Sequence, residues 1–202
     1  MNKPHLSMLV AAAMFALAPA ARAALAVDTG TPDGGAVGAL VFDGSDWIAA
    51  QVSFATATTI DGIAGHLLGG RAGETFDIAL LAGGDAPGAQ QFITTATYAA
   101  DGWNGASGLG WTVPAGSWWI EFEVNSNDTL GDTPTATGAL FDTGVARPVP
   151  TATTADWGFT YDASASSIGL QVTTVPEPGT VPQLAAGALL LASMAVARRR
   201  RG

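Results

Sequence analysis

The feature that most constrains this chain is a period-two alternation of apolar and polar residues that recurs in short runs. Within residues 117–124 two groups alternate, namely Trp118, Ile120, Phe122 and Val124, and then Trp119, Glu121 and Glu123. Successive side chains of a β-strand point to opposite faces, so this pattern predicts a half-buried strand. Residues 48–54 and 76–80 repeat it, and no part of residues 24–174 has amphipathic helical spacing. We therefore expect an all-β fold.

Turn residues divide the middle of the chain into about nine or ten short strands. We expect strands at residues 37–42, 47–54, 58–68, 74–82, 91–98, 111–113, 117–124, 138–142, 156–161 and 167–173. The glycine-rich residues 101–110 are predicted to form a loop. Many short strands with regular turn signals are typical of a single antiparallel β-sandwich, either jelly-roll-like or immunoglobulin-like.

The first 23 residues have the composition of a signal peptide. Lys3 supplies a positive start, residues 6–18 are almost wholly apolar, and Ala21 and Ala23 place small residues where an A-x-A cleavage site needs them. We expect cleavage after Ala23. The alternative is an N-terminal membrane anchor that is kept, although the apolar run is short for a span.

The last stretch, residues 175–202, has three parts in a fixed order. Pro176, Glu177 and Pro178 come first, and two prolines so close together predict an extended, accessible peptide. Residues 181–197 carry no charge. As a helix they would measure roughly 25 Å, a little less than the ~30 Å hydrocarbon core. The basic cluster Arg198, Arg199, Arg200 and Arg201 follows, which would stay on the cytoplasmic side. The alternative is a buried C-terminal helix.

This order of proline motif, short apolar helix and terminal arginine cluster resembles the PEP-CTERM sorting tail of Gram-negative bacteria. The resemblance covers residues 175–202 only. It implies that Pro176, Glu177 and Pro178 are recognised by an exosortase, a membrane processing enzyme of exopolysaccharide-producing cells. It also implies an exported precursor that is anchored transiently in the inner membrane, with its domain outside the cytoplasm, before release to the cell surface or extracellular matrix.

Between the two targeting ends, residues 24–174 have the length of one domain, the β-sandwich cargo. All 17 acidic residues of the chain lie between Asp28 and Glu177, where Arg71 and Arg147 are the only basic residues. Such a charge repels nucleic acid and anionic surfaces, and cations are its natural counterpart. The chain has no cysteine, which excludes disulfides and thiolate chemistry.

Residues with the chemistry of an enzyme are few. His66 is the only histidine outside the signal peptide, so a serine–histidine relay could use only His66. Ser107 misses the nucleophile-elbow pattern because Leu109 replaces its last glycine. Glu121 and Glu123 share a strand face at a separation that could serve glycoside hydrolysis. The simpler interpretation of this pair is a solvated strand face.

Binding has better candidates than catalysis. Trp119 and Trp103, with Trp47, are expected on outward faces or loops, where indole rings suit sugars and could contact an exopolysaccharide together with Glu121 and Glu123. The other tryptophans, Trp111, Trp118 and Trp157, are expected in the core. The alternative is that all six tryptophans are core or loop anchors.

Two oxygen-rich loops are candidate calcium sites, and no other cofactor is expected. Their residues are Asn125, Asn127, Asp128 and Asp132 in one loop, and Asp43 and Asp46 in the other. Turn capping by the same side chains explains both loops equally well.

These observations together predict an exported surface or matrix protein with a structural or adhesive role in an exopolysaccharide or biofilm matrix. The alternative is a carbohydrate-binding module, and a more distant one is a glycoside hydrolase.

Overall fold

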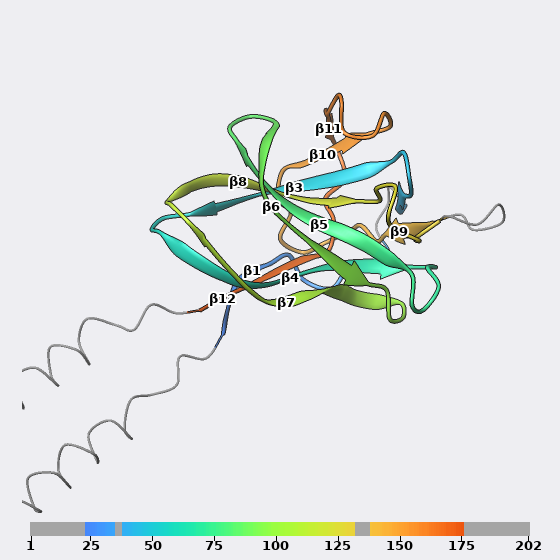
Figure 1. Cartoon of the computed structure of the whole chain (residues 1–202), viewed down its shortest axis with the longest axis horizontal. Coiled ribbons are helices and arrows are strands. Elements are labelled where there is room, and N and C mark those ends of the chain that lie inside the picture. Colours follow the sequence, from blue (N-terminus) through green and yellow to red (C-terminus); the bar gives the residue numbers. More distant parts are fainter. Residues whose placement is uncertain (1–22, 35–37, 132–137, 176–202) are drawn as a thin grey trace, which may run out of the picture. The chain divides into compact units, whose positions relative to one another are not determined.

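The computed structural model describes residues 23–34, 38–131 and 138–175, and this part of the chain is all-β. Strands β1 to β12 form two antiparallel sheets, as expected from the alternation (Figure 1). Apart from Ala23 and Val175, the expected signal peptide and sorting tail lie outside the described residues. Among the residues that are described, no helix is long and apolar enough to cross a membrane.

Each sheet contains six strands. The first sheet has the order β1 (Ala24–Asp28), β12 (Leu170–Val175), β4 (Thr58–Leu68), β9 (Ala139–Phe141) and β2 (Leu40–Phe42), with β7 (Gly102–Val113) also paired to β4. The second sheet has the order β11 (Asp162–Ser164), β10 (Thr151–Thr154), β3 (Trp47–Phe54), β8 (Gly116–Glu123), β5 (Thr75–Gly83) and β6 (Pro87–Thr97).

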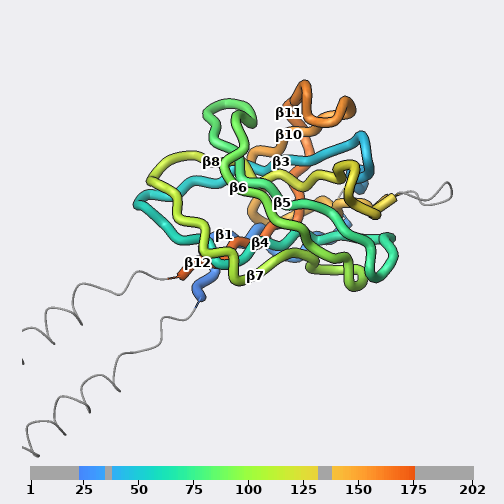
Figure 2. The backbone as a smooth tube through the Cα atoms, viewed as in Figure 1, coloured from blue at the N-terminus to red at the C-terminus, as the bar shows by residue number. Residues whose placement is uncertain are grey.

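Six consecutive strands pair in a nested order. β5 pairs with β6, β4 pairs with β7 on either side of that hairpin, and β3 pairs with β8 on either side of both. The tube in Figure 2 can be followed from β3 to β8 along this path. The middle of the domain is therefore one long antiparallel hairpin that folds over so that its parts alternate between the two sheets.

The main hydrophobic core is built from the apolar side of these strands. Phe122 and Phe76 come from the second sheet, and Phe42 and Phe141 come from the first. Their rings touch, with centroids 4.8 Å apart for Phe122 and Phe141 and 5.8 Å apart for Phe42 and Phe76. Because both sheets contribute to one cluster, the core lies between them, as in a β-sandwich.

Two sequence expectations about strands are wrong. Residues 102–110, expected as a loop, instead continue the expected strand at residues 111–113 into the long strand β7 (102–113), because they pair along β4 over most of its length. The glycine at position 105 is part of that pairing: a Cβ there would lie 2.0 Å from the carbonyl oxygen of Ile63. Residues 156–161, expected as a strand, instead connect β10 to β11.

The chain enters and leaves the domain at the same end. Ala24 pairs with Thr174, and Val175 pairs with Thr59 at the start of β4. The start of β4 comes shortly after Phe54, the last residue of β3. Trp47, the first residue of β3, lies roughly 23 Å from Phe54 along the strand, at about 3.3 Å per residue. β10 ends at Thr154, which pairs with Trp47, so the β10–β11 connection begins beside Trp47. It therefore lies at the end of the domain opposite to Ala24 and Val175 (Figure 1).

Candidate functional site

Trp119 lies on the outer face of the second sheet, but it is not exposed. The side chain is 3% accessible and packs with Ala49, Ala79, Leu81, Ala152 and Tyr161. Its Nε1 donates to the carbonyl oxygen of Gly84, at 3.3 Å, in the β5–β6 turn. Trp119 does lie on the face that points away from the main core, but the expectation that it is exposed is wrong, because the β5–β6 turn and Tyr161 cover it.

Glu121 and Glu123 occupy the same buried face. Their side chains are 3% and 6% accessible, so the expected solvated strand face is not present. The Tyr161 hydroxyl donates to Oε1 of Glu121. Burial raises the pKa of Glu121 to about 8, helped by the charge of Glu123 and a hydrogen bond to it. Glu121 thus keeps its proton at neutral pH, and a sugar could reach this pair only if the covering residues moved away.

The row of buried carboxyl groups continues toward the end of β8. Asp77, opposite Glu123 on β5, is 6% accessible, and Asp128 is 7% accessible. Burial raises the pKa of Glu123, with the charge of Asp77 as the next cause, and burial also raises the pKa of Asp128. The Asn125 side-chain amide donates to Asp77 Oδ2, while Asp77 Oδ1 is buried without a hydrogen-bond partner. This face concentrates acidic groups in a poorly solvated layer.

The proposed calcium ligands of this region take part in a turn. Asp128 Oδ2 accepts the Asn125 backbone N–H at 2.9 Å, and Asn125 Oδ1 accepts the Asn127 N–H at 2.9 Å. Asp132 lies outside the described residues. Within residues 23–34, 38–131 and 138–175, no three or more histidine, aspartate or glutamate side chains are arranged to hold a metal ion.

The second oxygen-rich loop is also an Asx turn. Asp43 Oδ1 accepts the backbone N–H groups of Ser45, at 2.8 Å, and Asp46, at 3.1 Å. Burial alone would raise the pKa of Asp43, but these donated hydrogen bonds outweigh it and lower the pKa. The loop connects β2 to β3 and so fixes where β3 begins.

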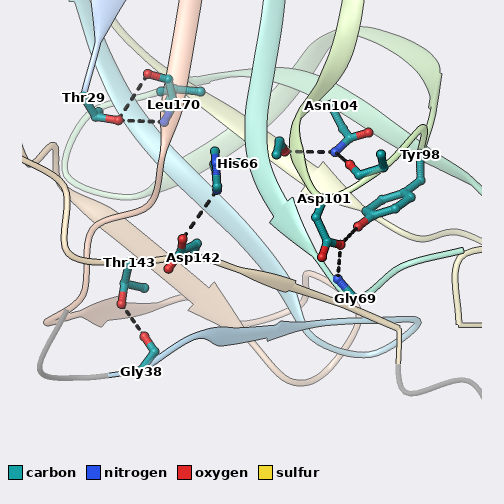
Figure 3. Close-up of polar contacts among 12 residues, drawn as sticks. Thr29, Gly38, His66, Gly69, Tyr98, Asp101, Asn104, Asp142, Thr143 and Leu170 are labelled. Atoms are coloured by element: carbon teal, nitrogen blue, oxygen red, sulfur yellow. Dashed lines mark hydrogen bonds and ion pairs between the residues drawn. The ribbon is translucent and has the colours of Figure 1, made fainter. Parts of the chain in front are cut away.

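His66 lies on β4 beside Asp142, without a serine partner. Its Nδ1 is 3.5 Å from Asp142 Oδ2, without hydrogen-bond geometry (Figure 3). The Trp103 ring meets the imidazole edge to face at 5.2 Å, so Trp103 is half-buried and does not form a free platform. Ser107 pairs with Gly62, four residues from His66 along β4, a separation of about 13 Å. The structure does not bring Ser107 and His66 together.

A shallow hollow of about 220 Å³ opens on the first sheet between β4, β7 and β12. It is lined by Gly62, Ile63, Ala64, Gly105, Ala106, Ser107, Gln171 and Thr173. The hollow forms where two strands carry glycine and alanine instead of larger side chains. Its lining has no aromatic or charged side chain, and its volume is below the ~300 Å³ of typical ligand pockets.

The exposed aromatic side chains of the described domain are in the β10–β11 connection. Trp157, expected in the core, is 61% accessible, and Phe159 is 84% accessible. Trp111 and Trp118, also expected in the core, do pack there, fully and partly. Trp157 is exposed because residues 156–161 form a connection and not the expected strand. The turn-forming Asp156 and Gly158 on either side of Trp157 could have indicated a loop.

No protein-family model matches this chain, and no curated protein matches it by sequence.

Proposed function

We propose that this protein is an exported surface or extracellular-matrix protein with a structural or adhesive, non-catalytic role in an exopolysaccharide or biofilm matrix. Its precursor is held in the inner membrane by the C-terminal tail, and an exosortase-type enzyme processes it at Pro176, Glu177 and Pro178. The finished domain then reaches the cell surface or the matrix.

The order of motif, apolar run and arginines in residues 176–201 carries this proposal. The domain supports this proposal in one respect: its first and last described strands pair with each other, so Ala24 and Val175 lie on the same side of the domain. The Thr174 hydroxyl is 3.5 Å from the Ala24 carbonyl oxygen. A signal peptide and a sorting tail would therefore join the domain at one place and leave its other surfaces free.

The buried carboxyl pair favours a non-catalytic role. Glycoside hydrolysis requires two carboxyl groups on either side of the substrate bond, with room for the sugar and a water. Glu121 and Glu123 are instead covered by the packing around Trp119 and by Tyr161. For the fold, the nested pairing of β3 to β8 favours a jelly-roll-like over an immunoglobulin-like arrangement.

Mass spectrometry of the protein from producing cells tests the sorting proposal. We expect the matrix fraction to contain chains that begin at Ala24 and lack Arg198, Arg199, Arg200 and Arg201. A variant in which Pro176, Glu177 and Pro178 are all changed to alanine should accumulate in the inner membrane with an intact C-terminus, because the enzyme no longer recognises it.

The matched control is Pro148→Ala, which changes an exposed proline inside the domain. It should be processed like the wild type. An intact C-terminus on wild-type protein in the matrix, or normal processing of the triple-alanine variant, would disprove the sorting proposal.

A further inference from the structure

The β10–β11 connection, residues 155–161, holds its exposed aromatic side chains in a defined conformation. Trp157 has a φ of +59°, in the left-handed region that a bulky residue adopts only at an energetic cost. Its ring is mostly in water, so packing against the core does not compensate for that cost. Strain of this kind, kept where it stabilises nothing, is found mainly at functional sites.

Asp156 and Thr154 hold the connection rigid from beneath. Asp156 Oδ1 accepts the Thr154 hydroxyl at 2.5 Å and the Thr160 backbone N–H at 2.9 Å. The Thr154 hydroxyl oxygen in turn accepts the N–H groups of Asp156 and Gly158, at 3.2 and 3.3 Å. Since these bonds fix the backbone on both sides of Trp157, a ligand would find this backbone already ordered, which lowers the entropic cost of binding.

The underside of the connection is anchored to the domain. The Trp157 backbone N–H donates to the carbonyl oxygen of Ser45 at 3.4 Å. A Cβ at Gly158 would lie 2.6 Å from Cζ3 of Trp47, so only glycine permits this close contact. Tyr161, at the base, donates to Glu121. Trp157 and Phe159 are thus exposed, while the Trp157 backbone, Gly158 and Tyr161 contact the domain beneath them.

The charge around the connection selects against anionic ligands. No basic residue occurs between Arg147 and Val175, whereas Asp156 lies in the connection and Asp162 directly follows it. A hydrogen bond from the Thr154 side chain and others from Thr160 lower the pKa of Asp156, so it is ionised at neutral pH. Acidic polysaccharides and anionic membrane surfaces would be repelled here.

The size of the exposed area selects against a protein partner. Two aromatic side chains offer roughly 150–250 Å² each, well below the ~800 Å² that each partner of a stable protein interface buries. A pyranose ring has an apolar face of C–H groups that fits on one indole, and its hydroxyl groups can meet the polar edge of the loop, including the exposed Thr160.

We infer that Trp157 and Phe159 form a binding site for neutral polysaccharide at the end of the domain opposite to Ala24 and Val175. This inference rests on the proposed matrix role and names its ligand class and its site. The two aromatic rings would therefore lie away from the ends of the domain at which the signal peptide and the sorting tail are removed.

Affinity electrophoresis of the full-length chain in nonionic detergent tests the inference. The gels contain neutral polymers (hydroxyethylcellulose, mannan, dextran, or the neutral fraction of the producing cell's matrix polysaccharide) or the anionic polymer alginate. We expect at least one neutral polymer to retard the chain and alginate not to. The double variant Trp157→Asn/Phe159→Ala should raise the dissociation constant about tenfold or more, as the loss of a hot-spot aromatic residue does.

The matched control is Ile93→Ala/Leu140→Ala, which removes two other exposed apolar side chains, 43% and 37% accessible, from β6 and β9. It should bind as the wild type does. Asparagine tolerates the left-handed conformation at position 157, so the binding variant should melt at the same temperature as the wild type or higher.

Retardation by no neutral polymer, retardation by alginate alone, or unchanged binding by the double variant would each overturn the inference. C-terminal processing is measured separately by mass spectrometry and does not depend on Trp157 or Phe159. Intact processing with absent polysaccharide binding would therefore count against the binding site and not against sorting.

Discussion

Glu121 illustrates at the scale of one residue what a buried carboxyl group without a basic partner does to stability. Its described neighbours are the apolar Ala49 and Ala79, the Tyr161 hydroxyl and the carboxyl group of Glu123. Burial raises its pKa to about 8, so the folded state retains a proton that the unfolded chain releases near pH 4.5. Where the folded state binds more protons than the unfolded state, stability falls as pH rises.

The variant Glu121→Gln should therefore flatten the pH dependence of stability. Below about pH 4.5 both the folded and the unfolded state of the wild type carry the proton, so Glu121 contributes nothing to the slope of stability against pH. Between about pH 4.5 and 8 the wild type should lose free energy of unfolding, by at most about 5 kcal/mol at 1.36 kcal/mol per pKa unit. Glutamine keeps an oxygen that can accept from Tyr161 and cannot ionise. Urea denaturation at pH 5 and pH 8 measures the difference.

Asp85→Asn is the control for this measurement, because Asp85 is exposed in the β5–β6 turn. It should leave the slope of stability against pH unchanged. If Glu121→Gln has the same slope as the wild type, the proton is not held by Glu121.

At the scale of elements, the pairing of β4 with β7 depends on small residues. Gly105→Ala would place its Cβ 2.0 Å from the Ile63 carbonyl oxygen and 2.6 Å from the Ala64 Cα, both backbone atoms that cannot rotate away. We expect a loss of about 2–4 kcal/mol, since overpacking against backbone shifts the strands apart. Gly84→Ala meets no atom within 4 Å and should cost much less. Thermal unfolding monitored by circular dichroism compares the two variants, and equal melting temperatures would contradict this account of β7.

The elements that the sequence predicts well are those whose own pattern decides their structure. The alternation in residues 47–54 and 117–124 corresponds to β3 and β8. Of β7, the sequence predicts only residues 111–113, because the glycine-rich residues 102–110 lack a strand pattern and become extended only by pairing with β4. Local propensity cannot include a partner that is some 40 residues away in the chain.

The candidate site was harder to predict than the fold for a related reason. Alternation correctly placed Trp119, Glu121 and Glu123 on the side of β8 that faces away from the main core, yet it cannot say what covers that side. The covering residues include Gly84, 35 positions from Trp119, and Tyr161, 40 positions from Glu121. Trp157 is the opposite case: it is an apolar residue expected in the core, but its loop leaves it exposed.

At the scale of the whole molecule, the excess of acidic residues is the property that follows most directly from the sequence. All 17 acidic residues and only two arginines lie in residues 28–177. One of those arginines, Arg147, places its guanidinium 2.8 Å from Asp28. The excess of like charges opposes compaction of the domain.

Salt should therefore stabilise this protein at neutral pH. Raising NaCl from about 0.01 M to 0.1 M shortens the Debye length from ~30 Å to ~10 Å and screens repulsion between carboxylates on different strands. We expect the melting temperature at pH 7 to rise by about 2–4 °C for each kcal/mol of relieved repulsion. Well below the ordinary carboxyl pKa of about 4, where repulsion among carboxylates is lost, the same salt should have little effect. KCl should match NaCl, because screening does not depend on the ion, whereas an extra rise with CaCl₂ at equal ionic strength would indicate a specific calcium site. A melting temperature at pH 7 that falls or stays constant as NaCl rises would show that repulsion among these carboxylates does not limit the stability of the domain.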